Sequence, residues 1–293
     1  MPNSTICLSF DFDALSVWFS YPQTSPAMLA RGEYGARVGL PRVLELLRRH
    51  AIPATFFIPG HTVESFPREV ESILAAGHEV GHHSYAHVNP GDQTPDEERR
   101  DMERALAALL AAGVTPTGYR SPSADFSAAT LGLLEEYGFR YDSSLMADDF
   151  TPYRPRVGDV VSRDQPLVRG REARLWEIPV SFEFDDWPHF QFTFAPYRNG
   201  TSAPSKVLEI WAADVDWMHA NVDGGVLTAM MHPQVIGRAH RIAMLDQFIA
   251  HCRAHEGLSF ARLGDVAQGL LAGGARSPYG DRDRGALTLW HRE

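Results

Sequence analysis

Two histidines four residues apart, His83 and His87, are the residues best suited to chemistry in this chain. Their spacing places two imidazoles on one side of a turn, and a divalent ion held by two neutral imidazoles needs a further ligand, often an anionic oxygen. Asp13 is our candidate, because Asp11 and Asp13 flank a single Phe and an extended chain directs alternate side chains the same way. The competing interpretation is chance spacing among 13 histidines, with the aspartates serving only as turn caps.

The composition indicates an ordinary globular protein. Its 293 residues fit a single α/β barrel, and 44% hydrophobic with 22% charged residues can bury a large core. A net charge of -10 without a basic cluster argues against nucleic acid or a membrane surface as partner. Cys7 and Cys252 lie in apolar patterns, so we expect buried thiols rather than a disulfide. The chain start lacks signal-peptide features, so we expect a cytoplasmic protein.

Strand and helix patterns alternate along most of the chain. Apolar runs predict strands at residues 5–10, 54–58, 78–81, 139–144, 174–184 and 224–232. Helical spacing predicts helices at residues 40–50, 67–76, 95–112, 127–137, 205–220, 239–255 and 264–271. Strand, helix and strand recurring at intervals of roughly 30 to 40 residues predict parallel pairing. We therefore expect a distorted (β/α) barrel of about seven or eight parallel strands, one domain over residues 1–272, and a loosely held tail at residues 273–293.

Two long stretches lack a regular pattern. Residues 14–39 combine four aromatic residues with Pro and Gly, which predicts a loop. This loop would form a lid or pocket wall or, alternatively, a surface segment whose aromatic side chains pack on the core. Residues 144–174 are rich in Arg, Pro and Asp and predict an extended loop over one face.

The candidate chemical residues fall at the ends of predicted strands. In a barrel of parallel strands the carboxyl ends share one rim, and active sites collect at that rim. The residues expected there are Asp11, Asp13, His83, Arg120, Trp187 and His232. Their convergence on one rim favours a catalytic centre over separate structural roles.

Five short segments resemble the motifs of the polysaccharide deacetylase family, carbohydrate esterase family 4. They are SFDFDA, HSYAH, YRSP, the DDWP region and MMHPQ, and the resemblance runs from the first strand to the last helix. Longer segments such as GHEVGHHSYAH and MHPQVIGR resemble a cytoplasmic subgroup. That subgroup contains a bacterial-type peptidoglycan deacetylase, allantoinase-like proteins and cyclic imide hydrolases.

The resemblance implies a role for each matching residue. Asp13, His83 and His87 would hold one divalent metal ion, with zinc favoured and cobalt, nickel, manganese or iron as alternatives. Asp11 would be the general base, oriented by Arg120, and His232 the general acid. The expected substrate contacts are Trp187, Tyr119 and Ser121, with a backbone N–H near Ser121 helping to hold the oxyanion.

The resemblance predicts a metal-dependent hydrolase of amide C–N bonds, and two substrate classes stay open. Family likeness favours deacetylation of an N-acetylated sugar. The Phe between Asp11 and Asp13, where most polysaccharide-active members have adjacent aspartates, argues against a polysaccharide substrate. The expected cytoplasmic location favours a small soluble amide, cyclic imide or ureide. Two histidines and one carboxylate also occur in non-haem iron oxygenases, and a binding protein that lost catalysis is a third alternative. The subgroup further implies a homo-oligomer.

Overall fold

Eight parallel strands form the centre of the computed structural model, which describes residues 4–20, 25–192 and 201–273. The sheet order is β10-β1-β2-β3-β4-β5-β8, and β9 pairs with the other edge of β1. A parallel bridge between Asp185 and Met230 carries the segment after β8 toward β9. The predicted distorted barrel of seven or eight parallel strands is confirmed. The strands are β1 (Ser4–Asp11), β2 (Thr55–Ile58), β3 (Glu79–His82), β4 (Gly118–Tyr119), β5 (Tyr141–Asp142), β8 (Trp176–Glu177), β9 (Val226–Met231) and β10 (Leu258–Phe260).

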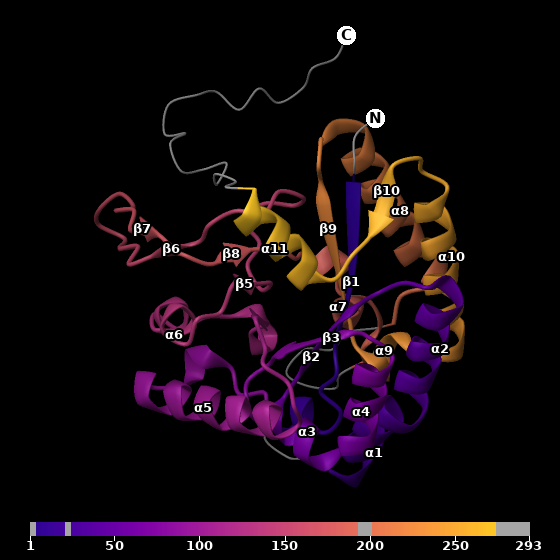
Figure 1. Ribbon diagram of the computed structural model, residues 1–293, viewed down its shortest axis with the longest axis horizontal. Coiled ribbons are helices and arrows are strands. Elements are labelled where there is room, and N and C mark those ends of the chain that lie inside the picture. The colour runs from indigo at the N-terminus through magenta and orange to yellow at the C-terminus, as the bar shows by residue number, and fades with distance from the viewer. Residues whose placement is uncertain (1–3, 21–24, 193–200, 274–293) are drawn as a thin grey trace.

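Strand β1 is the centre of this sheet. It pairs with β9 over residues 5–10, with β2 near its carboxyl end and with β10 near its amino end. Helices cover the sheet, so its strands are buried on both faces and their sequences read as continuous apolar runs (Figure 1). Phe10, for example, stacks on Phe56 of β2 with ring centroids 5.0 Å apart.

Most predicted helices are present, with small shifts at their ends. Thr94 and Glu97 form a capping box that fixes the start of α5, whereas α6 begins at Thr130 rather than at residue 127. Among the described residues no helix is both long and apolar enough to cross a membrane. The helices are α2 (Leu40–His50), α3 (Gly60–Ser65), α4 (Pro67–Ala75), α5 (Pro95–Ala111), α6 (Thr130–Glu136), α7 (Asp186–Phe190), α8 (Pro204–Asn221), α9 (Pro233–Ile236), α10 (Ala239–Arg253) and α11 (Leu263–Ala272).

The prediction of an irregular loop at residues 14–39 is wrong for most of that stretch. The described part contains a 3-10 turn at Ser16–Ser20, helix α1 (Pro26–Tyr34) and a π-helical turn at Gly35–Gly39 that runs directly into α2. The glycines that suggest a loop instead allow close helix packing. A Cβ atom at Gly32 would lie 2.3 Å from the carbonyl oxygen of Ala14, and one at Gly39 would lie 2.0 Å from that of Pro233.

The predicted loop at residues 144–174 is largely irregular but carries a small antiparallel hairpin, β6 (Arg156–Val157) with β7 (Arg171–Glu172). The strand predicted at residues 174–184 is regular only over β8. Cys7 and Cys252 are buried free thiols, as predicted. The predicted tail lies outside the described residues except for Gly273.

Candidate active site

The end of β1 delivers two buried carboxylates to the rim. Asp11 is the last residue of the strand, and the N–H of Phe12 still donates to the carbonyl oxygen of Phe57. The chain turns at Ala14, whose φ is 49°, after the Asp13 carbonyl has accepted a hydrogen bond from Thr62 Oγ1 at 2.6 Å. These backbone contacts fix both carboxylates, which are 3% and 0% exposed.

A tight turn after β3 positions the two histidines. Ser84 and His87 have φ of 58° and 57°, and the Ser84 hydroxyl accepts a hydrogen bond from the His87 N–H at 2.9 Å. The N–H of Ser84 donates to Nδ1 of His82, so His82 supports the turn from below. His83 Nδ1 lies 2.7 Å from the carbonyl oxygen of Arg120. Because a carbonyl can only accept, Nδ1 carries the proton and Nε2 presents its lone pair.

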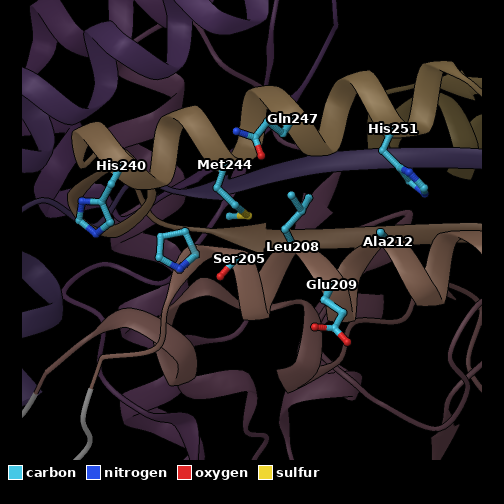
Figure 2. A pocket seen from close by; sticks show the side chains of 9 residues that line it. Ser205, Leu208, Glu209, Ala212, His240, Met244, Gln247 and His251 are labelled. Atoms are coloured by element: carbon cyan, nitrogen blue, oxygen red, sulfur yellow. The ribbon is translucent and has the colours of Figure 1, made fainter.

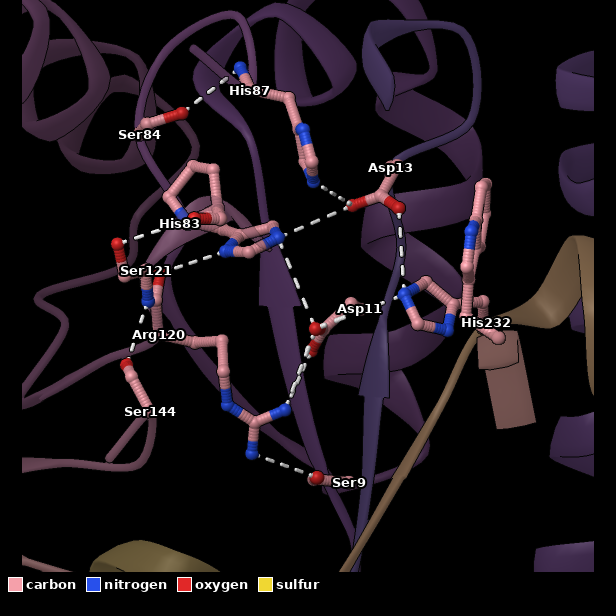
Figure 3. A network of polar contacts seen from close by, with 12 residues as sticks. Ser9, Asp11, Asp13, His83, Ser84, His87, Arg120, Ser121, Ser144 and His232 are labelled. Atoms are coloured by element: carbon pink, nitrogen blue, oxygen red, sulfur yellow. Dashed lines mark hydrogen bonds and ion pairs between the residues drawn. The ribbon is translucent and has the colours of Figure 1, made fainter. Parts of the chain in front are cut away.

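Asp13, His83 and His87 meet at one point (Figure 3). Asp13 Oδ1 lies 3.4 Å from His83 Nε2 and 3.9 Å from His87 Nε2. Both Asp13 Oδ1 and His83 Nε2 are buried, yet neither makes a hydrogen bond to a described residue. Buried polar atoms are normally hydrogen-bonded, so this pair calls for a further partner. One carboxylate and two imidazoles are a ligand set that fits a divalent first-row metal ion.

The electrostatics of these three residues suit ligation. Burial raises the pKa of Asp13, but His87 and His83 outweigh it and lower that pKa to about 2. Burial lowers the pKa of His87 to about 4, so its imidazole is neutral near pH 7. Metal ligands must be an ionised carboxylate and neutral imidazoles, and Asp13 and His87 meet that requirement. Burial also lowers the pKa of His83, but the charges of Asp11 and Asp13 outweigh this effect and raise that pKa.

Arg120 holds Asp11 beside this group. Its Nη1 donates to Asp11 Oδ1 at 3.1 Å, and its Nη2 donates to the hydroxyls of Ser9 and Ser143, each at 3.1 Å. The guanidinium is fully buried and lies 4.5 Å from the ring centroid of Phe57. A planar cation fixed at so many points can orient the carboxylate that it binds.

His232 faces the same two aspartates from the end of β9. Its Nε2 lies 4.0 Å from Asp11 Oδ2 and 3.9 Å from Asp13 Oδ2. On the other side of the ring, Nδ1 lies 2.7 Å from Asp186 Oδ1. Burial lowers the pKa of His232, but Asp186 and Asp185 outweigh it and raise that pKa to about 10. The imidazolium form is therefore favoured near neutral pH, with Nε2–H directed into the site.

The three predicted substrate contacts differ in position. Trp187 is partly exposed at the rim, with its ring 5.1 Å from that of His232. Tyr119 is 2% exposed inside an apolar cluster and stacks on His82, so its side chain lies in the core, and its substrate contact stays a prediction. The Ser121 N–H donates to Ser144 Oγ at 2.8 Å, and the oxyanion contact near Ser121 stays a prediction.

Sequence reasoning missed two residues that touch the site. Asp186 binds His232 through both carboxylate oxygens, and Gln234 Nε2 lies 3.3 Å from Asp13 Oδ2. The sequence does carry a signal for Asp186, because an Asp pair directly after a predicted strand is placed at the rim of the barrel, beside Trp187. Gln234 follows His232 by two residues, on the short helix α9, whose direction the sequence pattern does not reveal.

Comparison with known proteins identifies the family. The family model described as polysaccharide deacetylase matches residues 32–141. A peptidoglycan deacetylase from Helicobacter pylori is 36% identical over 280 residues, which cover 91% of this chain and 96% of that protein. This chain belongs to the polysaccharide deacetylase family. The predicted resemblance is thus confirmed, and the chain is a hydrolase acting on carbon–nitrogen bonds.

Solved structures of this family share the fold. A putative polysaccharide deacetylase from Mycobacterium smegmatis is 32% identical, with a TM-score of 0.83 over 100% of this chain and 95% of that chain. An allantoinase is 24% identical, with a TM-score of 0.76 over 92% of this chain and 91% of that chain. The second likeness concerns the fold alone.

Proposed function

We propose that this deacetylase family member removes an acetyl group from an N-acetylated sugar of the peptidoglycan type. The observation that carries the proposal is that a carboxylate and an imidazole, each held in place by a neighbouring charged residue, lie against the three candidate metal ligands. Asp11, held by Arg120, lies 3.9 Å from Nε2 of the ligand candidate His83. His232, held by Asp186, lies 3.9 Å from Asp13 Oδ2. The 36% identity to a peptidoglycan deacetylase over most of both chains supports this substrate class.

Asp13, His83 and His87 would hold the metal ion, for which zinc is our proposal. When bound, such an ion lowers the pKa of water toward neutrality and polarises the amide carbonyl. Gln234 Nε2 donates to the second Asp13 oxygen, which leaves Oδ1 directed at the two histidines. Gln234 thus holds Asp13, and the Arg120 carbonyl oxygen holds His83, by the kind of second contact that metal sites usually require.

Asp11 is the proposed general base. Its Oδ2 lies 3.9 Å from His83 Nε2 and 4.0 Å from His232 Nε2, so it faces the space between the ligands and the acid. Arg120 Nη1 donates to Oδ1 at 3.1 Å and also to Oδ2 at the longer distance of 3.4 Å, which fixes the direction of the carboxylate. A proton taken from the attacking water would therefore be received on Oδ2, where the carboxylate is open to the site.

His232 is the proposed general acid. An amide nitrogen leaves poorly unless it is protonated as the C–N bond breaks, and such proton transfer contributes roughly 100- to 10,000-fold in rate. Asp186 keeps Nδ1 protonated and favours the imidazolium, so Nε2–H is the proton available to the leaving nitrogen. Trp187 beside the imidazole would form one wall of the groove.

A small cyclic imide or ureide is the second candidate substrate. The side chains at the centre of the site are each at most 7% exposed: Asp11, Asp13, His83, His87, Arg120 and His232. At the rim, Trp18 packs against Trp187 with ring centroids 5.7 Å apart. A centre so enclosed favours a compact substrate, and the shared fold with an allantoinase agrees with this alternative. Because the chain belongs to a hydrolase family, we no longer propose the non-haem iron oxygenase.

Hydrolysis of a substrate panel before and after chelation tests the proposal. The panel contains N-acetylglucosamine oligomers, succinimide, hydantoin and allantoin, with metal content measured in parallel. Acetate release from the oligomers that stops on chelation and returns with zinc supports the first candidate. Turnover of an imide or ureide alone selects the second candidate, and full activity in metal-free protein contradicts the proposed ligand set.

We also propose a cytoplasmic homo-oligomer. The two buried free thiols fit a reducing compartment. The β6–β7 hairpin exposes Val161 and Val168, at 79% and 56%, which gives a small apolar surface for a second copy. Light scattering of the purified protein and of V161K tests this proposal, since loss of self-association in the variant is the expected result. A monomeric wild-type protein would contradict it.

A further inference from the structure

A second group of potential metal ligands lies outside the candidate active site, between helices α8 and α10. Asp216 of α8 points at two histidines on α10 and just beyond it. Its Oδ1 lies 2.7 Å from His251 Nε2 and 3.0 Å from His255 Nε2. The three side chains are 54%, 32% and 20% exposed, so solutes can reach them. None of the three takes part in the chemistry proposed above.

The hydrogen bonding of His255 turns its second ring nitrogen toward Asp216. Its Nδ1 lies 3.1 Å from the carbonyl oxygen of His251, at the end of α10. A carbonyl can only accept, so Nδ1 carries a proton and Nε2 is the nitrogen that faces the carboxylate. Nε2 lies 3.0 Å from Asp216 Oδ1, so a cation between the two atoms would be held by both.

We propose that Asp216, His251 and His255 form a second divalent-metal site, of the zinc type, that joins α8 to α10. His251 in the last turn of α10 and His255 two residues beyond its end both direct a ring nitrogen at Asp216, and the neighbouring helix α8 supplies this carboxylate. Zinc bonds of about 2.0 to 2.2 Å in a tetrahedron place neighbouring ligand atoms about 3.3 Å apart. The observed 2.7 and 3.0 Å therefore need to widen by only a few tenths of an ångström.

This site lies at the opposite end of the barrel from the candidate active site. The ring of His219 is 5.0 Å from that of His255, and His219 Nδ1 lies 3.2 Å from Ser4 Oγ. Ser4 begins β1 and Asp11 ends it, and seven steps of about 3.3 Å separate the ends of this eight-residue strand by about 23 Å. An ion held here cannot touch the substrate, so its effect is to fasten the two helices together.

A groove between the same two helices leads to this group. Figure 2 shows side chains of α8 and α10 facing each other across it, with His251 at one end and His240 at the other. Its volume is about 500 Å³, which gives solvent and ions a path to His251. His240 is exposed and lies outside the three-residue group, so it provides a matched histidine on the same helix.

Zinc stoichiometry of the full-length protein tests the proposal. We expect two zinc ions per chain in the wild type and one in H83A/H87A, in which the candidate active-site ligands are gone. In that background, added zinc should raise the thermal midpoint. The further change H251A should weaken the remaining zinc binding at least roughly tenfold, since loss of a group that merely supports a ligand already costs that much, and it should abolish the midpoint shift.

Control variants make each outcome decisive. H240A in the same background should keep both the zinc and the midpoint shift. If H83A/H87A does not fold, H251A/H255A in the wild-type chain decides the question, because both positions are partly exposed and lie outside the buried core, and this variant should bind one ion fewer. Equal zinc content with and without His251 and His255 overturns the proposal. So does a midpoint that H251A lowers equally in zinc and in chelator, since that result indicates an ion pair alone.

Discussion

Asp186 holds His232 by two contacts from one carboxylate: Oδ1 lies 2.7 Å from the ring Nδ1, and Oδ2 accepts the backbone N–H at 3.0 Å. The side chain and the main chain of His232 are thus fixed by the same group. Rotation of the imidazole would break the first contact while the second persists. This arrangement sets both the direction and the charge of the proposed acid.

The first prediction concerns the pH dependence of activity in D186N. The wild-type pKa of His232 is raised to about 10, first of all by the charge of Asp186 against the effect of burial. Removing that charge destabilises the imidazolium, so the pKa falls. Activity that needs protonated His232 is then lost at lower pH, and the alkaline limb of kcat/KM should move to lower pH than in the wild type.

A matched variant checks that this shift comes from direct contact. Asp185 Oδ1 is 3.7 Å from His232 Nδ1, and D185N removes the same charge from the greater distance. Its alkaline limb should move less than that of D186N. Equal shifts in both variants, or none in D186N, would show that Asp186 does not set the protonation of His232.

The second prediction separates the base from the ligands. D11N should lower kcat by roughly 100- to 10,000-fold, because its amide cannot accept a proton from water. Metal content should stay near the wild-type value, since the three proposed ligands are unchanged. D13N should instead lose the metal. Metal analysis and steady-state kinetics on both proteins check this, and a metal-free D11N protein would contradict the division of roles.

The third prediction concerns the close packing of residues 14–39. In G39A the added Cβ would lie 2.0 Å from the carbonyl oxygen of Pro233, directly after His232. Such overpacking costs about 1–3 kcal/mol, and displacement of this turn should also lower kcat. Denaturant unfolding and kinetics measure both effects. The control is G132A, in α6, where no atom lies within 4 Å of the added Cβ and a gain of about 0.5–1 kcal/mol is expected.

The fourth prediction concerns two buried acids below the rim, Asp142 and Glu177. Burial raises the pKa of each above its ordinary value, and the charge of Asp142 raises that of Glu177 further. Between the pKa values of the unfolded and folded chains, the folded state therefore binds more protons than the unfolded state. The pair contributes its full stabilisation below the pKa of the unfolded state. This contribution is lost as the pH rises through the pKa of the folded state.

Glu177→Gln removes one of these titrations. Its free energy of unfolding should fall less steeply with rising pH than that of the wild type, above about pH 4 where an unfolded Glu ionises. Ser144 and Leu145 donate their backbone N–H groups to Glu177 Oε1, and the Gln side-chain oxygen can accept both bonds. Urea unfolding at several pH values measures the difference. An unchanged slope would show that the folded state does not bind an extra proton at Glu177.

The sequence by itself determined the barrel and the core of the candidate site. Apolar runs at regular intervals require parallel strands, and the carboxyl ends of parallel strands meet at one rim. For that reason Asp11, Asp13, His83, Arg120 and His232 could be grouped before any coordinates were known, and the structure brings them within contact distance.

Tertiary structure decided what depends on contacts between distant segments. Gly32 and Gly39 signal a loop when read locally, yet they lie in helical segments. They are glycines because the chain at Ala14 and Pro233 approaches them too closely for any side chain. The partner of His232 is 46 residues away, and Asp216 meets His251 across 35 residues. Local pattern carries no information on such pairs, because the packing of whole helices and strands sets their distances.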